Sequence, residues 1–219
     1  MLHFEAIYPS LPFIVAGIGV TLKFTIISLL CGLPLGVILA IAKISNVYSL
    51  QKLAQAYTAV FRGTPLLLQL GLVYYATPQL TGNMYVISVF QAGIITFSLN
   101  SAAYSSEIIR AGIRAIDPGQ WDAAKVLGIP TYQTWFKIIL PQAVRNILPA
   151  LVNEMVDLLK ETALISIIGE ADLLRRAQIV AAEKFLYFEP VIVAASLYFM
   201  MVMMISFFAK KLEKKLSYA

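Results

Sequence analysis

Five apolar stretches dominate this chain, and each is long enough to cross a bilayer. They cover about residues 11–42, 50–76, 85–109, 147–168 and 190–209. A span takes about 20 predominantly apolar residues, and backbone inside lipid must satisfy its own hydrogen bonds. We therefore expect an all-α, polytopic membrane protein with five transmembrane helices, built as one transmembrane domain over residues 1–219.

The composition agrees with a lipid environment. Hydrophobic residues make up 59% of the chain and charged residues 13%, against about 45–50% and about 25% in ordinary globular proteins. The net charge of +5 does not indicate nucleic acid. No basic segment is interleaved with aromatic residues, and a cluster of lysines follows the last apolar stretch as a stop-transfer flank does: Lys210, Lys211, Lys214 and Lys215.

Catalytic chemistry has little support in the sequence. His3 is the only histidine and Cys31 the only cysteine, which excludes a histidine-rich metal site and a Ser-His pair. No Walker A pattern occurs, so ATP is not held by that loop in this chain. We expect no catalytic residue, no metal and no cofactor here.

Basic residues indicate how the spans are oriented. Lys43 and Lys52 lie between the first and second spans. Between the third and fourth spans lie Arg110, Arg114, Lys125, Lys137 and Arg145. These two loops share one side of the membrane if the spans alternate. The lysine cluster after the fifth span falls on the same side. Basic loops stay in the cytoplasm. We therefore expect an N-terminus outside, with no cleaved signal peptide, and a cytoplasmic C-terminus.

The loop between the third and fourth spans, about residues 115–141, is the only sizeable one. Pro118 and Gly119 predict a turn followed by a short helix, and Pro130 predicts a second break. A second short helix then leads to Leu140-Pro141. The loop is expected to form two amphipathic helices on the cytoplasmic face.

This loop resembles the signature of bacterial ABC-importer permease subunits: Glu-Ala-Ala, three residues, Gly, nine residues, Ile, one residue, Leu-Pro. Here the pattern reads Asp122-Ala123-Ala124, Gly128, Ile138, Leu140 and Pro141. Asp122 in place of Glu is the one departure. The resemblance implies a coupling helix whose small residues let an ATPase approach closely, with Asp122, Ala123, Ala124, Gly128 and Pro141 as the coupling positions. An ordinary connector of good helix formers is the alternative.

Three further segments are similar to the polar amino-acid branch of these importers. They are Arg62–Gln69, residues 102–112, and Lys160–Leu164. The resemblance implies a multi-pass subunit of the bacterial inner membrane that pairs with an identical or homologous permease. Two cytoplasmic ATPases would bind ATP and Mg, an extracytoplasmic protein would deliver the amino acid, and transport would proceed by alternating access.

Four ionisable residues lie in the fourth span, where charge is costly and indicates function. Glu154 and Glu161 differ by only about 20° around a helix and about 10 Å along it. We expect both to contact a cationic substrate. The alternative is a structural role, in which Lys160 neutralises Asp157 three residues away. The two carboxylates that remain would then be protonated or pair with Arg62.

Polar residues in the other spans complete the candidate site. Asn100 and Ser101, in the third span, suit the polar backbone of an amino acid, and Leu67 would form an apolar wall. Their alternatives are an interhelical hydrogen bond and ordinary packing.

An inner gate is the last expectation. Arg62, Glu107 and Arg110 flank the cytoplasmic ends of the second and third spans, where ion pairs would close the path; interfacial snorkelling is the alternative. The function indicated is the permease of an importer for polar, basic amino acids. An ATP-independent cation-coupled carrier or channel would explain the acids of the fourth span, but not the Ala-Ala-Gly-Leu-Pro loop.

Overall fold

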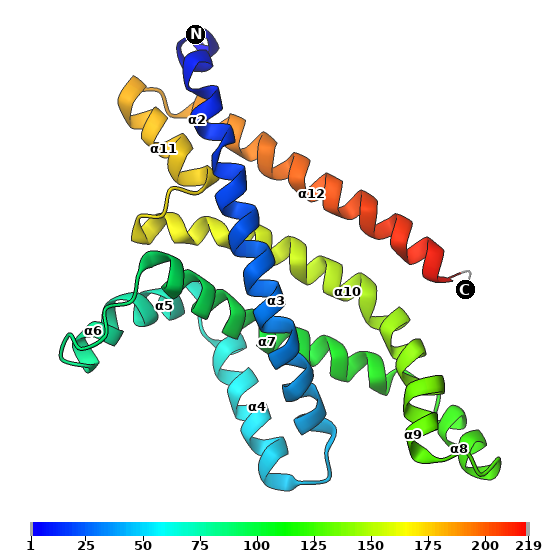
Figure 1. Cartoon of the computed structure of the whole chain (residues 1–219). Coiled ribbons are helices and arrows are strands. Elements are labelled where there is room, and N and C mark those ends of the chain that lie inside the picture. The colour runs from blue at the N-terminus through cyan, green and yellow to red at the C-terminus, as the bar shows by residue number, and fades with distance from the viewer. Residues whose placement is uncertain (1, 218–219) are drawn as a thin grey trace.

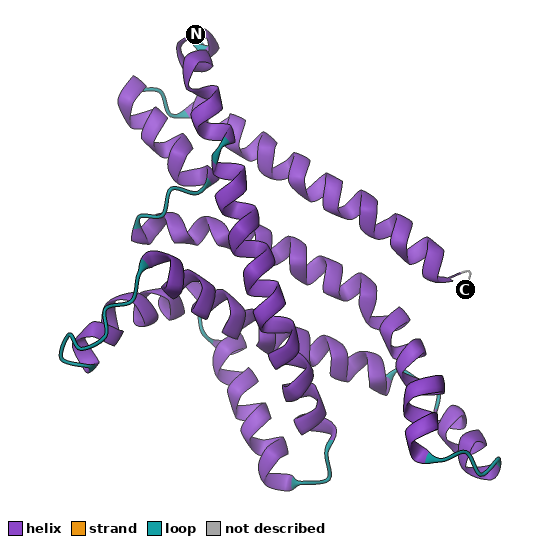
Figure 2. Ribbon diagram, in the orientation of Figure 1, coloured by secondary structure: helices purple, strands orange, loops and turns teal. Residues whose placement is uncertain are grey.

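The computed structural model describes residues 2–217, with side chains as far as residue 214. Lys215 of the predicted basic flank therefore lies outside the described side chains. Helices and connecting loops make up this whole part of the chain, without a strand (Figure 2). In chain order they are α1 (Phe4–Ile7), η1 (Tyr8–Ser10), α2 (Leu11–Val15), α3 (Gly17–Ile44), α4 (Tyr48–Gly63), α5 (Leu66–Gly71), η2 (Leu72–Ala76), α6 (Thr77–Leu80), α7 (Val89–Arg114), α8 (Pro118–Val126), α9 (Thr131–Gln133), η3 (Thr134–Ile139), α10 (Leu140–Glu161), η4 (Thr162–Ile168), α11 (Leu173–Lys184) and α12 (Phe188–Ser217).

Two helical stretches are long and apolar enough to cross a membrane. Phe4–Ile44 has a mean hydropathy of 2.5 over its most apolar part, and Phe188–Lys214 has 2.3. They contain the first and fifth expected spans. The helices of the third and fourth expected spans carry more polar or charged residues, and the second expected span is divided into shorter helices, so length and hydropathy do not select these three.

The second expected span is not one helix. α4 ends at Gly63, Thr64 and Pro65 are extended, and α5 begins at Leu66. Proline restricts the residue before it to extended backbone, which explains the break at Thr64. The third expected span also differs in its bounds, since α7 runs from Val89 to Arg114.

The second helix of the predicted loop does not stop at Leu140-Pro141. Helix continues from Thr131 through the π-helical η3 into α10, so the helix that contains the fourth expected span begins well before residue 147. A proline ring clashes with the carbonyl four residues before it. For Pro141 that carbonyl belongs to Lys137, inside the wide π turn, which gives the ring room without ending the helix.

The crossing of α3 over α7 forms the centre of the fold (Figure 1). Two glycines of α3 lie directly against α7. A Cβ added to Gly32 would stand 2.8 Å from the carbonyl oxygen of Ser98, and one added to Gly36 would stand 2.9 Å from the Cβ of Ser105. Small residues of this kind let two helix backbones approach closely in lipid.

The crossing is lined with hydroxyl groups as well as glycines. Within the described part of the chain, five buried hydroxyls of α3 and α7 have no hydrogen-bond partner: Ser28, Thr96, Ser98, Ser101 and Ser105. A cluster of apolar residues also joins α3, α5, α7 and η4. Phe24 and Phe97 meet edge to face at 6.1 Å in that cluster, packed with Leu70 and Ile165.

The helix α11 is fixed against α2, α3 and α12. Asp172 is fully buried at its N-terminus, where its carboxylate accepts hydrogen bonds from the amide of Arg175 at 2.8 Å and the hydroxyl of Tyr198 at 3.2 Å. The guanidinium of Arg176 donates to the carbonyl of Phe13 at 3.1 Å. These contacts hold the ends of the first and last long helices together at one end of the molecule.

Gly32→Ala tests the close crossing. The added methyl meets backbone, which cannot rotate away, so we expect the free energy of unfolding to fall by about 1–3 kcal/mol. Gly19→Ala is the matched control on the same helix, because nothing lies within 4 Å of its added Cβ, and it should be neutral or slightly stabilising. Unfolding of the purified protein in detergent measures both, and equal effects would contradict the packing described.

Candidate substrate and coupling sites

An open cavity of about 510 Å³ lies where α7, α10 and η4 meet. It is lined by Tyr104, Glu154, Asp157, Lys160, Glu161, Ala163 and Leu164. Both acids singled out in the sequence, Glu154 and Glu161, therefore face one space, as their spacing around a helix predicts. The cavity is open at the surface of the single chain.

The charges of this cavity do not balance. Lys160 Nζ lies 2.7 Å from Asp157 Oδ1, which is the internal pair that the sequence left open. Among the described residues, Glu154 and Glu161 have no ion-pair partner. Three carboxyl groups and one ammonium thus line the space, and the two that have no basic partner, Glu154 and Glu161, are half-buried.

Tyr104 is a cavity residue that sequence reasoning did not select. It stands four residues after Asn100, but Asn100 does not line the cavity, so this spacing could not have identified Tyr104 as a cavity residue. The guanidinium of Arg62 lies 5.1 Å from the centre of the Tyr104 ring. Arg62 therefore stacks beside the acidic cavity and is absent from the ion pairs of Glu107.

Asn100 is buried and fastens the break between α4 and α5. Its Nδ2 donates to the carbonyl of Phe61 and to Gln69 Oε1, both at 3.1 Å. Gln69 Nε2 in turn donates to the carbonyls of Phe61 and Thr64, at 2.8 and 3.0 Å. The interhelical hydrogen bond, the alternative considered for Asn100, is the arrangement found.

The remaining predicted contacts do not line the acidic cavity. Ser101 is fully buried in α7 beside Glu154. Leu67 is 41% exposed on α5. The structure thus brings Glu154 and Glu161 together and places Asn100, Ser101 and Leu67 outside their lining.

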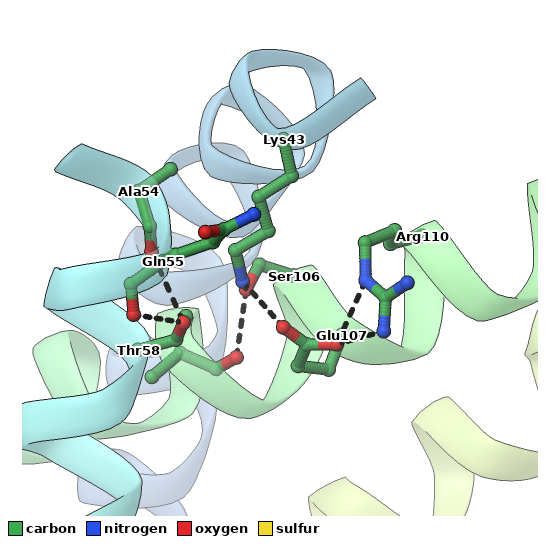
Figure 3. A network of polar contacts seen from close by, with 8 residues as sticks. Lys43, Ala54, Gln55, Thr58, Ser106, Glu107 and Arg110 are labelled. Carbon is green, nitrogen blue, oxygen red and sulfur yellow. Dashed lines mark hydrogen bonds and ion pairs between the residues drawn. The ribbon is translucent and has the colours of Figure 1, made fainter. Parts of the chain in front are cut away.

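The ion cluster at the far ends of α3 and α7 centres on Glu107 (Figure 3). Its Oε1 accepts from Lys43 Nζ at 2.8 Å, and its Oε2 pairs with Arg110 Nη2 at 2.6 Å. Lys43 also donates to Ser106 Oγ at 2.7 Å, and its side chain is only 1% exposed. The predicted gate therefore contains Glu107 and Arg110, with Lys43 in the place expected for Arg62.

Lys43 entered the sequence analysis only as a flanking charge. Its position could have been found from Gly32, Gly36 and Ala40, which precede it at helical spacing on the face that packs against α7. A lysine on that face is buried, and a buried charge needs a partner.

The predicted coupling helix is α8. Its first turn is capped by Asp117, whose Oδ1 accepts from the amide of Gly119 at 2.7 Å. Trp121 packs edge to face on Trp135 of η3 at 4.9 Å. α8 is therefore held against the base of the long helix that contains α10.

The small residues of α8 do not all face outward. Ala124 is buried, while Ala123 and Asp122 are exposed. Gly128 has a positive φ of 68° and ends the helix, so its conformation rather than its missing side chain explains the glycine. Val126 and Leu127 are 87% and 74% exposed at the end of α8; sequence reasoning did not single out these exposed apolar residues.

The profile of a protein family described as "Binding-protein-dependent transport system inner membrane component" matches residues 32–218. The chain belongs to this family. A putative glutamine transport system permease of Rickettsia conorii is 54% identical over 209 residues, 95% of each chain. An arginine transport system permease of Bacillus subtilis is 47% identical over 215 residues, 98% of this chain and 97% of the relative.

A solved structure has the same fold. A chain of an amino acid ABC transporter with histidines superposes with a TM-score of 0.92 at 40% identity, covering 98% of this chain and 99% of the other. The resemblance seen in the coupling loop is thereby confirmed. The chain is a permease subunit of an ABC transporter, a membrane component that works with other subunits and does not itself hydrolyse ATP.

Glu107→Ala should destabilise the permease strongly, because it leaves Lys43 buried without a partner. We expect the free energy of unfolding to fall by about 3–5 kcal/mol. The double variant Lys43→Met, Glu107→Leu should recover most of this loss. Asp122→Ala removes one partner of an exposed pair at 3.8 Å and should change stability by at most about 1 kcal/mol. Unfolding in detergent ranks the variants; a harmless Glu107→Ala would show that the cluster is solvated.

Proposed function

We propose that this permease moves polar, basic amino acids past the carboxylates of α10. That the chain is the permease subunit of an amino-acid ABC importer follows from its family and from its relatives. The basic side chain of the substrate is the proposal, and the unpaired carboxylates Glu154 and Glu161 in one open cavity carry it.

A cationic side chain fits this cavity better than a neutral one. Two half-buried carboxylates without a partner favour a cation, because burying charge is costly unless it is paired. A guanidinium or ammonium group would offset Glu161 first and Glu154 second. Arg62, stacked on Tyr104, would meet the substrate carboxylate at the side of the cavity.

The other predicted contacts take supporting roles in this proposal. The hydroxyl of Ser101 would donate a hydrogen bond to the carboxylate of Glu154 beside it. Leu67 would supply an apolar wall on α5. Asn100 would position the α4–α5 break, since its amide nitrogen is already bonded to Phe61 and Gln69.

We also propose an orientation, in which the chain lies in the bacterial inner membrane as one domain with five spans. These are α2 with α3, α4 with α5 and η2, α7, α10 with η4, and α12. In Figure 1 the N-terminus and α11 lie at one end, and α8 and the C-terminal end of α12 lie away from it. The basic residues near α8 support a cytoplasmic location for that side and for the C-terminus, with the N-terminus outside.

The proposed assembly has a second permease, two ATPases and an extracytoplasmic binding protein. The ATPases, which bind ATP and Mg, would contact α8. The contact residues would be Asp122, Ala123 and Gly128, together with the exposed Val126 and Leu127. Ala124 and Pro141 would support this surface without contacting the ATPase. Closure of the ATPase pair would move α8, and alternating access would follow. An ATP-independent carrier is disfavoured, because it has no use for this coupling module.

A continuous helix links the two sites. Residues 131–161 run without interruption through α9, η3 and α10, so the segment that carries Trp135 against α8 also carries Glu154 and Glu161. A helix transmits displacement along its axis more directly than a loop would. Movement of α8 would therefore be transmitted to Glu154 and Glu161 without passing through a loop.

Glu161→Gln tests the substrate proposal. It preserves shape and removes charge, so losing one charge-assisted contact should reduce arginine affinity at least tenfold, for a loss of about 1.5–3 kcal/mol. Glu183→Gln, exposed on α11 and outside the cavity, is the matched control. Arginine uptake by proteoliposomes of the complete transporter is measured with basal ATPase activity. Unchanged uptake by both Glu161→Gln and Glu154→Gln would disprove a cationic pocket.

Leu127→Asp tests the coupling surface. A carboxylate in an apolar contact is desolvated without a partner, so co-purification of the ATPase should fall at least tenfold while membrane insertion stays normal. Lys125→Gln alters charge on the same short helix, where Lys125 is exposed, and should retain most ATPase binding. Normal co-purification and transport with Leu127→Asp would place the ATPase contact elsewhere.

A further inference from the structure

A second cavity, of about 430 Å³, lies beside α8 at the ends of α3 and α7. Its polar lining includes Lys43, Gln51 and Arg114, and Trp121 and Trp135 form one wall. The basic group at its mouth is Arg114, which is exposed. The cavity is distinct from the acidic one, with which it shares no lining residue.

An apolar groove of about 610 Å³ continues from this cavity. Ile44, Ile113 and Trp135 line both spaces. From there the groove runs between α3, α7 and α10, past Val37 and Leu148. A polar, basic pocket thus opens into a longer apolar channel on the side of the molecule.

We propose that this composite site binds one anionic phospholipid, with its headgroup in the basic cavity and an acyl chain in the groove. The inference rests on the proposed orientation, which puts α8 at the cytoplasmic leaflet. Basic pockets between transmembrane helices on that side suit anionic headgroups.

The charges around the cavity favour an anion. Among the described residues, no carboxylate lines it. The nearest carboxylates have other partners, since Glu107 pairs with Lys43 and Arg110, and Asp117 accepts from the Gly119 amide. Arg114 has no ion-pair partner in the described part of the chain. A phosphate would bond to Arg114. Gln51 Nε2 already donates to the carbonyl of Ser45, and its second N–H is the neutral donor left for the phosphate.

The groove explains why the ligand carries a hydrocarbon chain. Side chains facing it remain open in the single chain, with Val37 40%, Ile41 57% and Val144 47% exposed. A small soluble anion would leave this surface uncovered. Trp135 lines both spaces and so stands at the junction, as expected where headgroups meet acyl chains, and Trp121 packs on it from the side of the basic cavity.

The bound lipid would bridge the moving parts of the subunit. The two spaces are lined by α3, α4, α7, α8, η3 and α10, and they include Lys43 of the ion cluster and Trp121 of the coupling helix. Anionic lipid at this point would hold α8 against the ends of α3 and α7.

Lipid retention tests the site directly. The assembled transporter is incubated in vesicles of equal phosphatidylglycerol and phosphatidylcholine, purified, and the retained lipid is counted by mass spectrometry. Arg114→Gln should lower phosphatidylglycerol retention about tenfold, because a charge-assisted bond is lost. Arg145→Gln makes the same change outside the two cavities and should retain lipid normally. Equal retention by the two variants would overturn the proposal.

A photo-crosslinker at Val37 identifies the occupant of the groove. An adduct to phospholipid in the assembled transporter is the expected result. An adduct to the second permease copy, with no lipid adduct, would show that protein fills the groove and would overturn the lipid assignment. Both measurements are made without amino acid, so failure of the basic-substrate proposal would leave their outcome unchanged.

Discussion

The close approach of α3 to α7 is the constraint on which the rest of this permease depends. Gly32 and Gly36 allow the two backbones to meet, and this contact brings Lys43 within reach of Glu107. The same crossing holds α7 where Tyr104 can face α10. Helices in lipid gain little from the hydrophobic effect and associate through such packing. Both the acidic cavity and the ion cluster therefore depend on the close packing that Gly32 and Gly36 allow.

The long helix through α9, η3 and α10 connects α8 to the acidic cavity without a break. Pro141 would ordinarily end or kink a helix, and the π turn before it keeps the path continuous. The result is one element that contacts α8 at its base and carries Glu154 and Glu161 farther along. The break at Thr64–Pro65 has the opposite effect, because it turns the second span and needs Asn100 and Gln69 to satisfy its freed carbonyls.

Periodicity and motif spacing predicted the features that depend on neighbouring residues. The pairing of Asp157 with Lys160 and the shared face of Glu154 and Glu161 follow from helix geometry alone. Long-range partners were beyond this reasoning. Nothing local indicates that Asn100 meets Gln69, or that Lys43 rather than Arg62 meets Glu107. Local rules also misjudged continuity, since Pro65 breaks a span while Pro141 does not.

The buried hydroxyls between α3 and α7 bear on how α7 lies in lipid. Ser98, Ser101 and Ser105 give α7 a polar face without hydrogen-bond partners among the described residues, and α7 is too polar to be selected as a span by hydropathy. Alone in lipid that face would be poorly solvated. The strongly apolar α3 packs on that face, and it precedes α7 in the chain. The first span therefore shields from lipid the hydroxyl groups that α7 alone would expose.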